Sequence, residues 1–113
     1  MSKYYDLTDV NEMAGGDQDF LKVIVQTFLE EIPPDVRSMI EAIENSNPSL
    51  AYQYAHKMKP NLQLFGLNLM DQVLTIEAWS KGNATEEAAN VAGERISTKV
   101  TSAESQLKSD FDL

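Results

Sequence analysis

The stretch AHKMKPNLQLFG, residues 55 to 66, contains the only histidine of the chain, His56. One lysine, Lys57, follows it directly, and a second, Lys59, comes three residues after it. A neutral imidazole nitrogen is a nucleophile, and an ammonium group one helical turn away can neutralise negative charge on a group attached to that nitrogen. This combination of residue types suits a phosphoryl group.

The sequence around His56 is also free of acidic residues. No Asp or Glu occurs from Asn45 through Met70, although the chain carries 18 of them among 113 residues. Lys57 and Lys59 should therefore create a locally positive potential, and nearby cations disfavour protonation of a histidine. We expect an imidazole that is uncharged at pH 7; the alternative is an ordinary surface histidine without chemistry.

Pro60 lies four residues after His56. In a helix it would remove the hydrogen bond that ends on the His56 carbonyl, at a cost of about 3 kcal/mol or more. Two interpretations are open. The proline either lets the helix curve around the core, or it exposes the histidine and gives a partner a small, rigid surface to approach.

Apolar residues from 21 to 43 recur with the spacing of one helical face, interrupted at Pro33-Pro34. This predicts a kinked helix or two abutting helices, which open at Asp17 or Asp19 and end near Asn45. The predicted face consists of Leu21, Ile24, Val25, Phe28, Leu29, Ile32, Val36, Met39, Ile40 and Ile43.

Three further segments follow the helical pattern. Asn47-Pro48 is an N-cap and first-turn proline pair, which opens a helix running to Gly66. The next helix covers about residues 69–82, and Asn83 with Glu86 three residues on is a cap pattern that opens the last one. Their predicted apolar faces are Leu69, Met70, Val73, Leu74 and Ile76, then Ala92, Ile96, Val100, Ala103 and Leu107.

These elements predict an all-α fold. A short helix over about residues 7–13 precedes the others, no strand-like alternation competes with the helical spacing, and the connections are a few residues long. Short connections favour antiparallel neighbours. We therefore expect one domain over residues 1–113, an antiparallel up-and-down four-helix bundle with a short additional N-terminal helix.

The predicted helix from residue 48 to 66 places His56 away from the core. At about 100° per residue, one side of this helix collects apolar residues, and the histidine lies on the other. The apolar side consists of Leu50, Ala51, Tyr54, Met58, Leu62 and Phe65; the histidine side consists of Ser49, Tyr52, Gln53, Lys59, Pro60 and Gln63.

Composition excludes several classes of function. The formal net charge of −9 repels a phosphate backbone, so we expect no nucleic-acid partner. Without cysteine or a second histidine, a metal site is not expected. The first residues lack the apolar run of a secretory signal, and no segment has the length of a membrane span, so we expect a cytoplasmic protein without a membrane partner.

The stretch Ala55-His56-Lys57-Met58-Lys59-Pro60, followed by Phe65-Gly66, resembles the histidine-containing phosphotransfer (HPt) domain family. The sequence FLEEIP at residues 28–33 and the order of the predicted helices are also similar, so the resemblance covers most of the chain. It implies that His56 is phosphorylated, that Lys59 steadies the phosphoryl group, and that Gly66 is a small position permitting close approach. Gln63 is a weaker candidate for a polar contact. Pro60 departs from the family's usual Gly, which affects partner preference.

The resemblance also implies partners. Such domains accept a phosphoryl group from the aspartate of a receiver domain, in a response regulator or hybrid sensor histidine kinase, and pass it to another receiver. They are phosphocarriers and not enzymes, and they hold no cofactor, because the receiver supplies Mg²⁺. Lys57 and Lys59 would attract the acidic pocket of a receiver and so guide its encounter with His56. Tyr52 and Leu64 could form an apolar docking surface. A monomer is the simpler expectation.

Two other functions compete with this interpretation. A helical adaptor that binds partners through its surface would tolerate replacement of His56. An enzyme with His56 as general base ranks last, because no Gly-x-Ser-x-Gly elbow, P-loop or convergent carboxylate pair accompanies the histidine.

Overall fold

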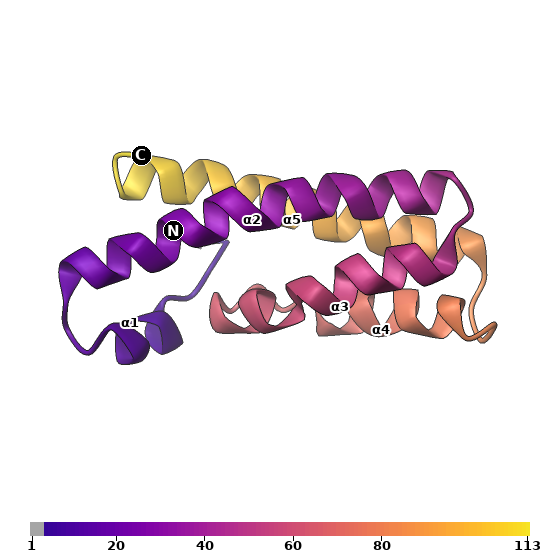
Figure 1. Ribbon diagram of the computed structural model, residues 1–113, viewed down its shortest axis with the longest axis horizontal. Coiled ribbons are helices and arrows are strands. Elements are labelled where there is room, and N and C mark those ends of the chain that lie inside the picture. Colours follow the sequence, from indigo (N-terminus) through magenta and orange to yellow (C-terminus); the bar gives the residue numbers. More distant parts are fainter. Residues whose placement is uncertain (1–3) are drawn as a thin grey trace.

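The computed structural model describes residues 4–113, and within them the chain is all-helical, without a strand (Figure 1). This confirms the prediction of an all-α fold. The helices are α1 (Thr8–Ala14), α2 (Gln18–Glu44), α3 (Pro48–Leu64), α4 (Met70–Ser80) and α5 (Glu86–Asp110).

The four longer helices enclose a common core. α2 packs against α3 and α5, α4 packs against α3 and α5, and α1 lies against α2. The body measures 44 × 25 × 21 Å, and Figure 1 shows α2 and α5 along one long side with α3 and α4 along the other. The Phe28 and Phe65 rings meet in the core with centroids 4.3 Å apart. Other large, fully buried side chains are Ile32, Met39, Met58, Leu67, Ile76, Ile96 and Leu107.

α2 is one continuous helix, so the alternative of two abutting helices at Pro33-Pro34 is wrong. Asp17 caps its start, and its Oδ1 accepts from the backbone N–H groups of Asp19 and Phe20 at 3.0 and 3.1 Å. The two prolines remove two hydrogen bonds from the helix, but the buried face continues through both turns. Packing of that face compensates for the missing bonds.

α3 carries the candidate site, and its boundaries follow from capping. Asn47 Oδ1 accepts from the Leu50 N–H at 3.2 Å and Pro48 occupies the first turn, as predicted. The helix continues through Pro60 and ends at Leu64. Gly66 follows with a φ of +63°, the left-handed conformation in which a glycine commonly terminates a helix.

The predicted core positions on α2 and α5 are all buried or half-buried against the core, whereas two predicted positions on α3 and α4 are wrong. All five predicted positions on α5 are buried. Leu50 and Leu74, however, are 37% and 47% exposed. Tyr54 is half-buried and packs against the core. On α3 the adjacent Ala51 takes the inward position, which turns Leu50 outward. On α4 the adjacent Val73 takes the inward position, which turns Leu74 outward.

The N-cap of α5 is Thr85 and not Asn83. Thr85 has extended backbone geometry, and its Oγ1 accepts from the Ala88 N–H at 3.0 Å. Asn83 lies in the preceding turn, where its own N–H donates to the Ala78 carbonyl at 2.7 Å. Both residue types suit the cap, and the turn that closes α4 decides between them. Over residues 4–113, no helix combines the length and apolar character needed to cross a bilayer.

Substitution of the cap should separate these two positions. We expect Thr85→Ala to lower the free energy of unfolding by about 1 kcal/mol, because the Ala88 N–H loses its acceptor. Asn83→Ala should change it by less than about 0.5 kcal/mol, as is usual for an exposed side chain. Urea denaturation of both variants measures the difference, and a larger loss in Asn83→Ala would contradict the assignment.

Candidate functional site

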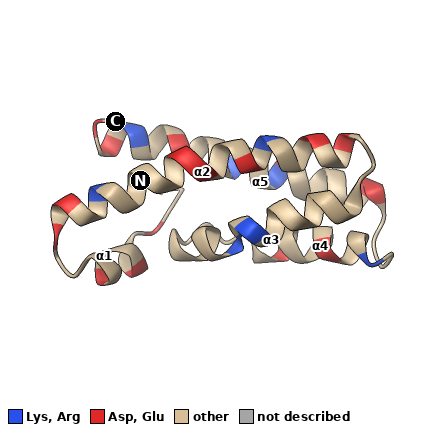
Figure 2. Cartoon of the chain, in the orientation of Figure 1, with Lys and Arg blue, Asp and Glu red and all other residues tan. Residues whose placement is uncertain are grey.

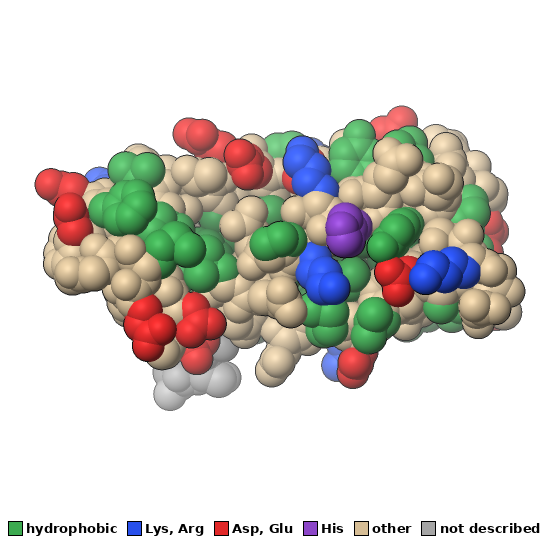
Figure 3. All heavy atoms as spheres, turned by 60° about the horizontal axis from the view of Figure 1, so that its bottom comes forward, with side chains coloured by type: hydrophobic (Ala, Val, Ile, Leu, Met, Phe, Trp, Pro, Cys, Tyr) green, Lys and Arg blue, Asp and Glu red, His purple; other side chains and the backbone are tan. Residues whose placement is uncertain are grey.

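His56 lies near the middle of α3 with its side chain exposed, on the face opposite the core. Within residues 4–113 it makes no hydrogen bond or ion pair. Figure 3 shows the histidine open at the surface, with basic side chains on two sides and hydrophobic side chains nearby. The predicted orientation is therefore confirmed, and the imidazole is accessible to another molecule.

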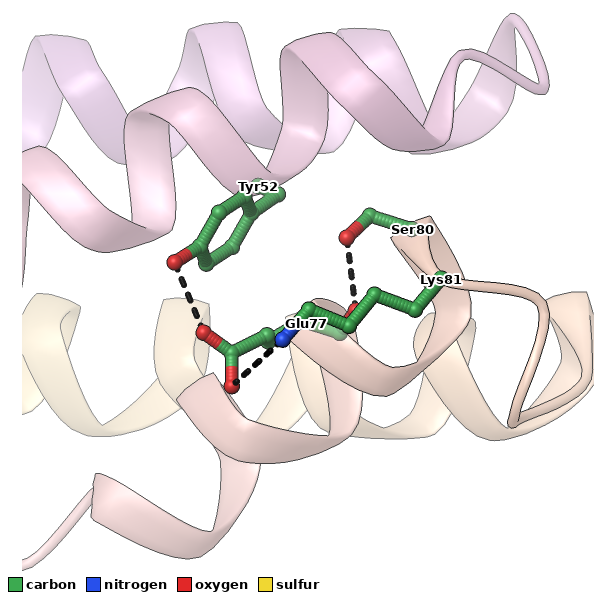
Figure 4. Close-up of polar contacts among 4 residues, drawn as sticks. All are labelled: Tyr52, Glu77, Ser80 and Lys81. Carbon is green, nitrogen blue, oxygen red and sulfur yellow. Dashed lines mark hydrogen bonds and ion pairs between the residues drawn. The ribbon is translucent and has the colours of Figure 1, made fainter.

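Tyr52, one turn before His56, is the aromatic neighbour of the imidazole. The ring centroids are 5.6 Å apart and the planes are inclined by 46°. The Tyr52 hydroxyl donates to Glu77 Oε2 at 2.7 Å, and Lys81 Nζ lies 4.0 Å from Glu77 Oε1 (Figure 4). The hydrogen bond from Tyr52, and secondly the charge of Lys81, hold the pKa of Glu77 below its usual value, so this carboxylate is ionised at neutral pH.

Lys57 points to another neighbour. Its Nζ donates to Asp35 Oδ1 on α2 at 3.2 Å. The Asp35 side chain is only 11% exposed, whereas that of Lys57 is 63% exposed. Lys57 therefore neutralises a largely buried carboxylate, which leaves less of its charge for a group on His56.

Lys59 lies one turn after His56 and, among the residues that the structure describes, forms no ion pair. It is half-buried at the edge of a cavity of about 230 Å³ between the end of α3 and the start of α4. Gln63 and Gly66 also line this cavity, so the structure brings three predicted site residues together. The other lining residues are Leu62, Asn68, Leu69, Met70 and Val73.

Gly66 lies just beyond α3 and not on it. The segment that approaches Gly66 most closely belongs to this chain: a Cβ at Gly66 would lie 2.7 Å from the Asp6 Cβ. The Asp6 N–H donates to the neighbouring Phe65 carbonyl at 2.8 Å. Because Gly66 has no side chain, the N-terminal segment at Asp6 can pack directly against it.

The remaining predicted site residues, Pro60, Leu64 and Tyr52, all lie on α3. Pro60 is exposed on α3, four residues after His56, and the helix passes through it. Leu64 is half-buried and packs against the core at the end of the helix, as Tyr52 does further back. Their roles in partner binding stay predictions.

The acid-free window of the sequence is not acid-free in space, which corrects the predicted electrostatics. Figure 2 shows α3 with basic but no acidic positions, whereas its neighbours carry acidic ones. Asp35 on α2 pairs with Lys57, and Glu77 on α4 reaches Tyr52. The positive potential is therefore partly cancelled. Lys59 forms no ion pair among residues 4–113, although its charge and that of His56 also help to lower the pKa of Glu77.

Sequence reasoning missed Asp35 and Glu77. Asp35 carried a signal: it lies between buried positions of α2, where an acidic residue needs a cation. For Glu77 the only indication in the sequence is Lys81 four residues later. This spacing predicts an ion pair along α4 but no contact with α3.

Within residues 4–113, no three His, Asp or Glu side chains converge in a way that could hold a metal ion. Comparison of the chain with protein-family models, with curated proteins and with solved structures finds no match. The site must therefore be interpreted from its own chemistry.

Proposed function

We propose that this protein is a histidine phosphotransfer protein of a multistep two-component phosphorelay. His56 accepts a phosphoryl group from the aspartate of one receiver domain and passes it to the aspartate of another. The observation that carries the proposal is an exposed imidazole in the middle of α3, without a hydrogen bond or ion pair to residues 4–113, with the half-buried Lys59 side chain one turn away.

For the transfer step this chain supplies a nucleophile and one cation. The lone pair of an imidazole nitrogen forms the N–P bond while the P–O bond to the receiver's aspartate breaks, and the aspartate leaves as a carboxylate. The imidazole keeps the proton on its other nitrogen. Lys59 offsets the charge of the phosphoryl oxygens, and the receiver supplies Mg²⁺ and the acidic residues that hold it. The second transfer reverses these bonds.

The proposal extends to architecture and partners. The arrangement of α2 to α5 fits an antiparallel up-and-down four-helix bundle, with α1 as the additional N-terminal helix. The partners are response-regulator receivers or a hybrid sensor kinase, and the carrier acts as a cytoplasmic monomer. Docking would occur on the α3 face around His56, with Pro60, Gln63 and Leu64 as contact candidates.

Phosphorylation by a receiver tests the proposal directly. A receiver domain charged on its aspartate with ³²P-labelled acetyl phosphate is mixed with the wild-type chain. We expect label on this chain that is lost in acid and retained in alkali, as for a phosphoramidate bond. Complex formation without label would favour the adaptor, and acid-stable label would place the phosphoryl group on a hydroxyl and contradict the proposal.

The two lysines should differ in this assay. Lys59→Ala should slow transfer by about 10- to 100-fold, the effect of losing one charged contact to the phosphoryl oxygens. Lys57→Ala is the matched control: the transfer rate of the folded variant should stay within about twofold, because Asp35 already neutralises Lys57. Single-turnover rates measure both, and a larger loss in Lys57→Ala would show that the cation assignment is wrong. Urea denaturation measures the stability that is lost when Asp35 is left unpaired.

A further inference from the structure

Tyr52 connects α3 to α4 directly beside His56. Its ring lies against the imidazole at a centroid distance of 5.6 Å, and its hydroxyl donates to Glu77 at 2.7 Å. Glu77 is itself placed by Lys81 at 4.0 Å, and its backbone carbonyl accepts from Ser80 Oγ at 2.6 Å (Figure 4). Both ends of the tyrosine side chain are therefore fixed, one by α3 and the other by α4.

This arrangement restricts the imidazole. An exposed histidine can occupy several χ1 and χ2 conformations, of which only some present a ring nitrogen to a docked partner. A tilted aromatic contact favours one ring orientation by about two- to tenfold in population. Tyr52 lies one turn before His56 and Lys59 one turn after it, so along α3 the His56 ring lies between the tyrosine and the cation.

We propose that Tyr52 is a positioning residue for the His56 imidazole and that Glu77 fixes Tyr52 across the α3–α4 interface. The inference rests on the proposed function and deepens it. It assigns Tyr52 a role other than docking surface. Because Tyr52 orients the His56 imidazole before the receiver arrives, the activation free energy of transfer contains a smaller cost for orienting that ring. Tyr52 forms no bond to phosphorus.

Kinetics of transfer separate positioning from docking. The probe is a receiver domain charged with acetyl phosphate, and the rate is measured over a range of receiver concentrations. We expect Tyr52→Leu to lower kcat about two- to tenfold with KM within about twofold of wild type. Tyr52→Phe should give a smaller loss. Tyr54→Phe, on the same helix but away from His56, is the control and should transfer at the wild-type rate.

A double-mutant cycle tests the role of Glu77. Glu77→Ala removes the acceptor, so it should match Tyr52→Phe, and the double variant should be no slower than either single one. Glu77→Gln keeps an oxygen acceptor for the hydroxyl and should retain most of the wild-type kcat. Additive losses in the double variant would overturn the link between the two residues.

The position of the ring can also be measured without phosphoryl transfer. Because His56 is the single histidine, its imidazole protons give one set of NMR signals. We expect nuclear Overhauser effects between these protons and the Tyr52 ring in wild type, which weaken in Glu77→Ala and persist in Glu77→Gln. Overhauser effects that are equally strong in Glu77→Ala would overturn the inference.

The two readouts distinguish failure of this inference from failure of the proposed function. If Tyr52→Leu raises KM and leaves kcat unchanged, Tyr52 is docking surface and the positioning role is wrong. If the receiver labels no variant, wild type included, the proposed function fails. The Overhauser effects in the Glu77 variants then decide by themselves whether Glu77 and Tyr52 orient the ring.

Discussion

His56→Gln should take up no phosphoryl label above background from a charged receiver domain. Glutamine has a similar reach and can hydrogen-bond, but its amide nitrogen has no available lone pair and cannot form the N–P bond. Because His56 is exposed and unpaired within residues 4–113, the substitution should change the free energy of unfolding by less than about 0.5 kcal/mol. Loss of label can then be attributed to chemistry and not to unfolding.

The matched control is Gln53→Ala, which changes another exposed position of α3 and leaves the histidine in place. It should be labelled as wild type is. Urea denaturation of both variants checks that the fold is intact. Label on His56→Gln at the wild-type level would show that another residue accepts the phosphoryl group, and the carrier assignment of His56 would be wrong.

What could be predicted from the sequence is what local chemistry determines. Asn47-Pro48 caps its helix as expected, and Asp17, one of the two predicted candidates, caps α2, because a cap needs only residues within one turn. The exposure of His56 followed from the spacing of apolar residues around α3. The predicted cap of α5, Asn83, is wrong, because Thr85 satisfies the same local rule and lies directly before the helix.

What could not be predicted depends on contacts between helices. Helical spacing gives the direction of Lys57 around its own axis, but not which residue of α2 it meets; the position of Asp35 follows from the crossing of the two helices. The same holds for Glu77, which reaches Tyr52 from α4. The electrostatic setting of His56 is therefore a tertiary property, although the histidine itself stands out in the sequence.

Gly66→Ala should lower the free energy of unfolding by about 2–4 kcal/mol. Its φ of +63° costs an L-residue about 1–2 kcal/mol. The added Cβ would also lie 2.7 Å from the Asp6 Cβ and 3.3 Å from the Asp6 backbone nitrogen. Because the contact is with a backbone segment, that segment must shift, which strains the 2.8 Å hydrogen bond from the Asp6 N–H to the Phe65 carbonyl.

Gly15→Ala is the control that isolates the contact from the backbone conformation. Gly15 has nearly the same φ, +61°, but a Cβ there would meet no atom within 4 Å, so only about 1–2 kcal/mol should be lost. In an Asp6→Gly background, which removes the nearest atom, the cost of Gly66→Ala should approach that of Gly15→Ala. Equal costs for the two alanine variants in the wild-type background would show that the N-terminal segment does not press on Gly66. A loss of transfer in a fully folded Gly66→Ala would instead support its role in the approach of a partner.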